Sequence, residues 1–167
     1  MTPLHQQSTS TVTGVFATRE DAEKAYQTLI KLGYKAEEIT LIMSEDTCDR
    51  LYEHDGDSFY NNAGLDYFKR KKLQVSRIPD ALDVYGRFVA IPGLALVVAG
   101  GLNEGGFRAL SESVMSDEYG EYFQSRIRDG EILIDFGLHT PKERSLIMGL
   151  WENYGGYPIA RKISNAA

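Results

Sequence analysis

The stretch from Ile91 to Gly101, IPGLALVVAGG, limits the possible folds of this chain more than any other. It could belong to a membrane span, to a glycine loop that cradles a phosphate, or to a buried strand that ends in a turn. A helix needs roughly 20 apolar residues to span a bilayer, whereas the apolar region from Phe88 to Leu102 is shorter and contains one proline and three glycines. The run LALVVA is typical of a strand buried on both faces, and the two glycines after it can form the turn. We therefore expect a buried strand and no membrane span.

The composition predicts one globular domain without a cofactor. The chain has 167 residues, of which 43% are apolar and 25% charged, and this is ordinary for a single domain. Its net charge of −6 disfavours nucleic acid and anionic membranes as partners. Cys48 is the single cysteine, so neither an internal disulfide nor a zinc site is expected. Residues 1–10 are polar and do not resemble a secretory signal, so we expect a flexible tail and a cytoplasmic protein.

The first part of the chain predicts a strand, a helix and a second strand. Residues 11–16, TVTGVF, are rich in β-branched side chains and predict the first strand. Thr18 is a good helix N-cap, apolar residues recur after it at helical spacing, and Gly33 can end the helix in the left-handed conformation. Residues 39–43, ITLIM, predict the second strand. The three elements form a compact βαβ unit.

Residues 44–90 are more polar and less periodic, and we interpret them as an insertion. Within it we expect a helix at 46–52, a turn at 54–57, a second helix at 58–71 and a strand at 73–77.

The last part predicts another strand–helix–strand arrangement and an added helix. We expect a strand at 93–99, a short helix from Phe107, a helix capped by Ser116, and a strand at 131–136. Thr140, followed by proline and then by glutamate at the third position, predicts the start of the added helix. Gly155 and Gly156 end that helix, and residues 157–167 read as a basic, polar tail.

Two βαβ units predict an α+β, ferredoxin-like sheet. In that fold the first and third strands are central and the second and fourth lie at the edges, so IPGLALVVAGG would contain a central strand. We expect the helices on one face of the sheet, the insertion between the two halves, and the C-terminal helix added at the end. The domain would then cover residues 11–156.

Three blocks of the sequence carry a resemblance to a bacterial family. They are TVTGVFATREDAEKAYQTLIKLGY with EEITLIMSEDT, then IPGLALVVAGGL, and last YGEYFQSRIRDGEILIDFGL with LWENYGGY. In content and order they resemble the general stress protein domain, also called the heat-induced stress protein YflT-like domain. The resemblance covers most of residues 11–156 and implies a stress-linked, non-enzymatic role without catalytic residues. Members carry a long Gly/Ala-rich segment, where this chain has the charged, tyrosine-rich residues 48–85.

Two segments are candidates for contact with a ligand or a partner. The glycines of residues 100–106 could cradle a phosphate, but the segment lacks a P-loop ending and contains Glu104, so a plain turn is the competing interpretation. The basic run at 69–72 follows aromatic residues and could hold a phosphate backbone, or it could be a solvated helix end. The candidate surface consists of Gly100, Gly101, Tyr60, Tyr67, Lys69 and Arg70.

No motif indicates catalytic or metal-binding residues, since neither a nucleophile elbow nor a P-loop occurs. We therefore expect a non-enzymatic, stress-associated protein that acts as a homo-oligomer, a dimer in the simplest case, or through a protein partner. The alternative is a small-molecule sensor that uses its sheet as other ferredoxin-like domains do.

Overall fold

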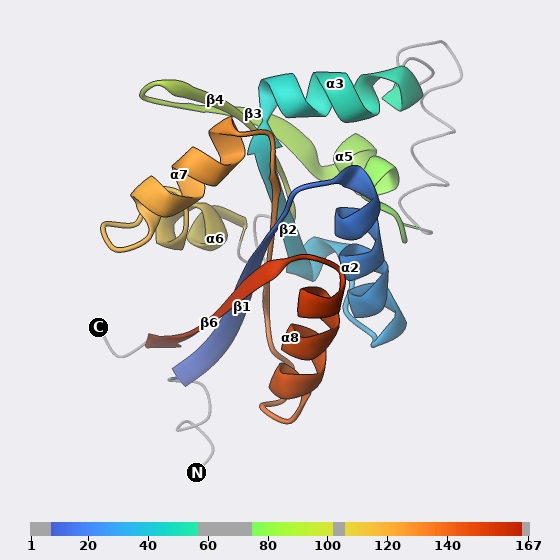
Figure 1. Cartoon of the computed structure of the whole chain (residues 1–167), viewed down its shortest axis with the longest axis vertical. Helices are drawn as coiled ribbons and strands as arrows, with labels where there is room; N and C mark the ends of the chain where they lie inside the picture. The colour runs from blue at the N-terminus through green and yellow to red at the C-terminus, as the bar shows by residue number, and fades with distance from the viewer. Residues whose placement is uncertain (1–7, 57–74, 102–105, 165–167) are drawn as a thin grey trace.

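The computed structural model describes residues 8–56, 75–101 and 106–164, and its centre is a six-stranded antiparallel sheet (Figure 1). The order of the strands across the sheet is β3-β4-β2-β5-β1-β6. The strands are β1 Ser8–Phe16, β2 Ile39–Ser44, β3 Gly86–Ile91, β4 Leu94–Ala99, β5 Ile132–Gly137 and β6 Tyr157–Ser164. The helices of the described residues are α2 Arg19–Lys31, α3 Glu45–Gly56, α5 Ile78–Tyr85, α6 Gly106–Glu112, α7 Gly120–Arg128 and α8 Glu143–Asn153, with a 3-10 turn, η1, at Ala36–Glu38.

The α+β class is as predicted, but the strand order is not ferredoxin-like. The central strands are β2 and β5, which are the second and fourth predicted strands, whereas β4 lies outside them next to β3. The prediction that the first and third strands are central is therefore wrong. The reason is that ITLIM, LALVVA and ILIDF are similarly continuous apolar runs, so that periodicity could not rank their depth in the sheet. β2 and β5 are buried almost completely because each pairs with a strand on both of its sides.

Helices cover both faces of the sheet, which corrects the prediction that they lie on one face. We call the side covered by α2, α3, α5 and α8 the first face, and the side covered by α6 and α7 the second face (Figure 1). Side chains of β2 alternate between them, since Leu41 and Met43 pack on the first face and Ile42 packs on the second. A strand whose alternate residues are all apolar needs cover on both sides.

The two crossover connections have opposite hands. β1 and β2 run parallel because each pairs antiparallel with β5. β4 and β5 run parallel because each pairs antiparallel with β2. The pair β1 and β2 runs opposite to the pair β4 and β5, and the step from β1 to β2 crosses the sheet in the opposite direction to the step from β4 to β5. If the connecting helices lay on the same face, the two connections would therefore have the same hand. With α2 and α6–α7 on opposite faces, one connection is left-handed, whereas nearly all parallel crossovers are right-handed.

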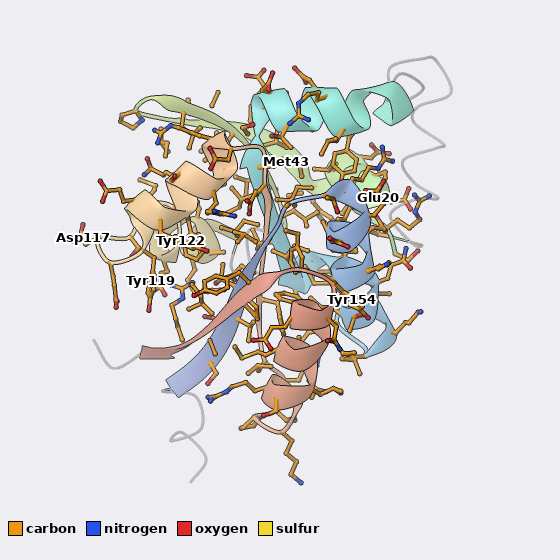
Figure 2. The ribbon with its side chains drawn as sticks, viewed as in Figure 1. Glu20, Met43, Asp117, Tyr119, Tyr122 and Tyr154 are labelled. Atoms are coloured by element: carbon orange, nitrogen blue, oxygen red, sulfur yellow. The ribbon has the colours of Figure 1, made fainter. Side chains whose placement is uncertain are left out.

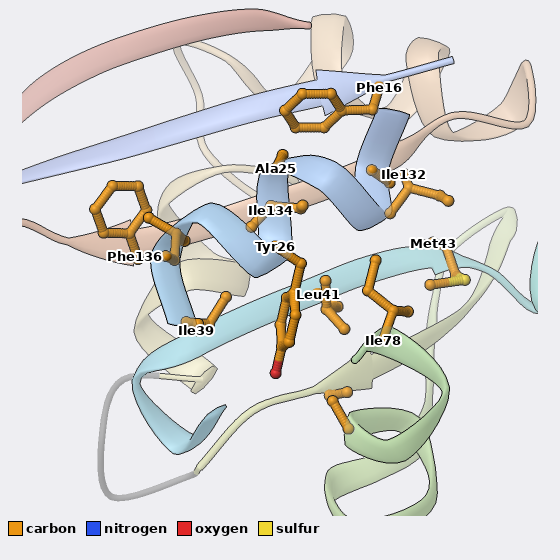
Figure 3. Packing of buried hydrophobic residues seen from close by; sticks show 14 of the residues in the cluster. Phe16, Ala25, Tyr26, Ile39, Leu41, Met43, Ile78, Ile132, Ile134 and Phe136 are labelled. Atoms are coloured by element: carbon orange, nitrogen blue, oxygen red, sulfur yellow. The ribbon is translucent and has the colours of Figure 1, made fainter. Parts of the chain in front are cut away.

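The core of the first face is aromatic and apolar. Trp151 of α8 lies edge-on to Phe16 and Phe136, at ring centroid distances of 5.2 and 5.5 Å. Figure 3 shows Phe16 and Phe136 beside Tyr26 and the rest of α2. Gly14 makes room for the indole, since a Cβ atom there would lie 2.7 Å from a ring carbon of Trp151.

The first βαβ unit forms as the sequence predicts. The hydroxyl of Thr18 accepts a hydrogen bond from the backbone N–H of Asp21 at 3.1 Å, and this caps α2. Gly33 follows the helix with a φ of +100°, the left-handed region that glycine favours. The first strand begins at Ser8, earlier than the predicted Thr11.

The predicted insertion contains part of the sheet. Its first helix is confirmed as α3, but the helix continues through residues 54–56, where we expected a turn. The described residues 75–77 of the predicted strand are not in a strand, and the second predicted helix lies outside the described residues. The sequence prediction missed α5 and β3, because IPDALDVYGRFVAI switches from helix to strand at a single glycine. Gly86 has no space for a side chain, since a Cβ atom would clash with the carbonyl group of Leu82.

The last helices begin later than predicted, and the predicted tail is a strand. Ser116 accepts hydrogen bonds from the backbone N–H groups of Glu118 and Tyr119 in a turn, and α7 begins four residues later. Thr140 likewise lies in a turn before α8, and its carbonyl accepts from the N–H of Glu143. Residues 157–164 are not a tail but β6, which pairs along the length of β1. Pairing with β1 supplies the order that the polar sequence RKIS does not indicate.

Candidate functional site

The outer strand β3 forms one edge of the sheet in the described part of the chain. β4 is its only neighbour among the described strands, and its side chains alternate between exposed and half-buried. Phe88 is 74% exposed and lies opposite Val97 on the first face. Edge strands usually carry a lysine, a proline or a bulge that discourages pairing with another chain. β3 has none of these in GRFVAI, and its one charged side chain, Arg87, donates to the carbonyl of Gly100 at 3.2 Å.

The opposite edge strand, β6, differs in sequence. It contains Pro158 and Lys162, which are residue types that protect an edge against pairing. Of the two edges of this sheet, only β3 has the composition of a strand that can accept another strand.

A buried ionic cluster lies on the second face. Asp135 of β5 is fully buried, and its carboxylate accepts a hydrogen bond of 2.6 Å from the hydroxyl of Thr13 on β1. Arg108 of α6 donates to the same carboxylate at 3.1 Å. Arg161 of β6 lies 3.6 Å from it and donates to the hydroxyl of Thr13 at 2.6 Å. One carboxylate thus links three strands and a helix.

The cluster has more donors than acceptors. Two guanidinium groups share the single carboxylate of Asp135. Three buried polar atoms around it have no hydrogen-bond partner among the described residues: Nη1 of Arg108, Nε of Arg161 and Oγ1 of Thr11. Two of these atoms, the arginine nitrogens, are donors only, and a buried donor without a partner is costly.

A groove of about 460 Å³ opens beside Arg161. The guanidinium carbon of Arg161 lies over the ring of Tyr119, 5.1 Å from its centroid, which is within the range of a cation–π interaction. Figure 2 shows Tyr119 and Tyr122 on the side of the sheet that α7 covers. The residues that line the groove are Ser111, Glu112, Ser116, Glu118, Tyr119, Ala160 and Arg161.

The candidate residues from the sequence fall in different places. Gly100 follows β4 and lies against β2, where a Cβ atom would be 2.8 Å from the hydroxyl oxygen of Thr40. The backbone N–H of Gly101 donates to the carbonyl of Glu37 at 3.0 Å. These two glycines thus allow a close strand contact and a turn. The remaining candidates, Tyr60, Tyr67, Lys69 and Arg70, lie outside the described residues.

A second polar cluster joins η1 to the start of α8. The Nε2 atom of His139 lies 2.6 Å from a carboxylate oxygen of Glu38, and its ring stacks on Tyr34 at 3.9 Å. The hydroxyl of Tyr34 accepts from the N–H of His139 at 3.0 Å and donates to the carboxylate of Glu143. Burial, aided by the bond to Glu143, raises the pKa of Tyr34 above its ordinary value. The members satisfy one another, so we interpret this cluster as a structural tie.

The described residues contain no group of three or more histidine, cysteine or acidic side chains that could hold a metal ion. Cys48 is half-buried on α3. In the same part of the chain, no helix is long and apolar enough to cross a membrane. Residues 91–101 contain the end of β3, the whole of β4 and the turns on either side of β4, as the strand interpretation predicts.

Sequence reasoning missed both the edge and the ionic cluster. The buried site of Asp135 could have been predicted, because a carboxylate within the apolar run ILIDF needs polar partners. The role of Arg161 could not, because its segment has the polar composition of a tail.

Comparisons with known proteins give no relative: no family model, no curated protein and no solved structure matches this chain. The resemblance to the general stress protein domain stays a prediction.

Proposed function

We propose that this chain is a non-enzymatic protein that acts by self-association through the edge of β3, in a stress-associated, cytoplasmic setting. The observation that carries the proposal is the exposed Phe88 on an apolar edge strand without a protecting residue. The stress setting is supported by the sequence resemblance, and the reducing compartment by the use of a single cysteine.

A second copy of the chain is the partner that fits this edge. Most homodimers are two-fold symmetric, and two β3 strands would pair antiparallel around an axis normal to the sheet. Such an axis keeps each side chain on its own face, so Phe88 would face Phe88 or Ala90 of the partner subunit. Both registers keep Arg87 away from its own copy, so no like charges meet at the centre. The two sheets would then continue into one.

The charge of the chain gives the association a characteristic salt dependence. Each copy carries a net charge of −6, so two copies repel at long range. Salt screens this repulsion over a distance of about 10 Å at 0.1 M. Association through an apolar edge should therefore become stronger as the salt concentration rises.

The test is light scattering of the full chain over a concentration series, with two matched variants. Phe88→Lys places a charge on the edge strand, and Leu146→Lys places the same charge at another exposed apolar side chain, on α8. We expect the wild type and Leu146→Lys to dimerise as concentration rises and Phe88→Lys to stay monomeric. A wild type that is monomeric throughout, or a Phe88→Lys variant that dimerises normally, would contradict the proposal.

A second candidate function, small-molecule binding, is favoured by the groove beside Arg161 and by the two guanidinium groups that share the one carboxylate of Asp135. A thermal-shift screen against metabolites tests it, because a ligand that binds the native state raises its stability.

A further inference from the structure

The groove beside Arg161 carries unpaired negative charge at its rim. Glu112, at the end of α6, and Glu118, in the turn before α7, both line it. Neither carboxylate forms an ion pair with a residue in the described part of the chain. Ser111 and Ser116 add hydroxyl groups to the same walls. This side of the groove is suited to a cationic group with several N–H donors.

The inner end of the groove has the opposite character. Arg161 lines it, with only 11% of its side chain exposed. Its two terminal nitrogens donate to the carbonyl of Glu112 and to the hydroxyl of Thr13, but its Nε–H has no acceptor in the described structure. Because Asp135 also serves Arg108, one guanidinium charge is in excess. This end is suited to a carboxylate.

From this arrangement we infer that the groove binds a small zwitterion of the amino-acid class. The carboxylate of the ligand meets the guanidinium of Arg161 where this side chain lines the groove, and its ammonium group meets Glu112 and Glu118. An anion without the ammonium group would be repelled by the two glutamates. A cation without the carboxylate would leave the excess charge of the buried cluster uncompensated.

The size and walls of the groove agree with such a ligand. A volume of about 460 Å³ lies within the range of roughly 300–1,000 Å³ that ligand pockets occupy. Tyr119, whose ring lies under the guanidinium of Arg161, is part of the lining. Most of the lining is polar, so we expect amino acids with polar side chains to bind best.

The inference does not depend on self-association. Arg161 belongs to β6, at the opposite edge of the sheet from β3. A chain that fails to dimerise can still bind a zwitterion, and a chain that binds no zwitterion can still dimerise, so the two ideas fail separately.

The first experiment is a thermal-shift screen of the full chain with the twenty L-amino acids, followed by calorimetric titration of those that bind. Each amino acid is tested beside its N-acetyl and its amide derivative, which remove one charge at a time. We expect at least one free amino acid to raise the melting temperature by roughly 5–10 °C at a hundred times its Kd, and neither derivative to do so. The absence of any response, or equal binding of either derivative, would overturn the inference.

Variants then locate the site. Glu118→Gln should weaken binding of that amino acid about tenfold, and the double variant Glu112→Gln/Glu118→Gln more than that, because each loses a charge-assisted hydrogen bond. Glu121→Gln is the matched control, since Glu121 is exposed on α7 and does not line the groove. Circular dichroism without ligand confirms that each variant folds. Unchanged affinity in the folded double variant would place the binding elsewhere and overturn the inference.

Discussion

The two faces of the sheet are stabilised in different ways. In the described part of the chain, α2, α3, α5 and α8 cover the first face, which is packed with large apolar side chains, among them Trp151, Phe16 and Phe136. The second face is covered by two short helices, and its apolar core around Phe123 and Leu133 gives way to a cluster of threonine, arginine and aspartate. Both faces belong to the same strands, so the difference arises from alternate residues of a single sequence.

The comparison separates packing from chemistry. A packed apolar face is stabilised in proportion to the area it buries, but it has few of the polar groups that fix the orientation of a ligand. A buried ionic cluster adds less stability than it costs when one member is lost, but it fixes charges in defined positions. The groove opens where this cluster reaches the surface, so we expect the second face to be the one that binds.

The largest effect should come from the first face. Trp151→Ala removes a fully buried side chain that contacts two aromatic rings and whose indole N–H donates to the carbonyl of Ala25. We expect a loss of about 3–5 kcal/mol in the free energy of unfolding, measured by urea denaturation. Leu146→Ala, at an exposed position of the same helix, should change it by less than about 0.5 kcal/mol. Similar losses for both variants would mean that α8 does not pack as described.

A smaller loss is expected on the second face. Asp135→Asn keeps the shape of the side chain but leaves Arg108 and Arg161 without a carboxylate, which should cost about 2–3 kcal/mol. Adding Arg108→Gln to that variant should recover part of the loss, because one uncompensated charge is removed. Urea denaturation of the two variants measures both steps. If the second substitution only adds to the loss, the arginines are not coupled through Asp135.

The smallest expected effect is a difference between the first and second faces in how the free energy of unfolding depends on alkaline pH. Burial, aided by Glu23, raises the pKa of Tyr26, whose hydroxyl lies in the first-face core without a partner among the described residues. The folded state therefore keeps this phenol neutral, and its contribution is fully present below the unfolded pKa of about 10 and declines as pH rises above it. Tyr26→Phe should be nearly neutral at pH 7 and should reduce the loss of stability by about 1 kcal/mol between pH 10 and 11.

Tyr122, beside the second face, provides the control for that measurement. Burial also raises its pKa, but Arg126 opposes the shift. Tyr122→Phe should therefore change the alkaline loss of stability less than Tyr26→Phe does. An equal change in the two variants would contradict the difference in burial. Denaturation curves at several pH values measure it.

Local signals in the sequence predicted the parts of the fold that local physics controls. The Thr18 cap, the left-handed Gly33 and the apolar runs of β1, β2, β4 and β5 identified their elements, because capping, glycine conformation and burial periodicity act within a few residues. The same signals misplaced the starts of α7 and α8, because Ser116 and Thr140 form turns that precede the helices.

The sequence by itself therefore determined the class of the fold and the identity of most of its elements. Only the tertiary structure decided the strand order, the division of helices between two faces, and the existence of β3 and β6. It alone brought Arg108 and Arg161 to Asp135, from positions 27 and 26 residues away on either side. The physical reason is that strand pairing and ion pairing join residues distant in the chain, and their energies depend on which partners meet rather than on which residues are neighbours in sequence.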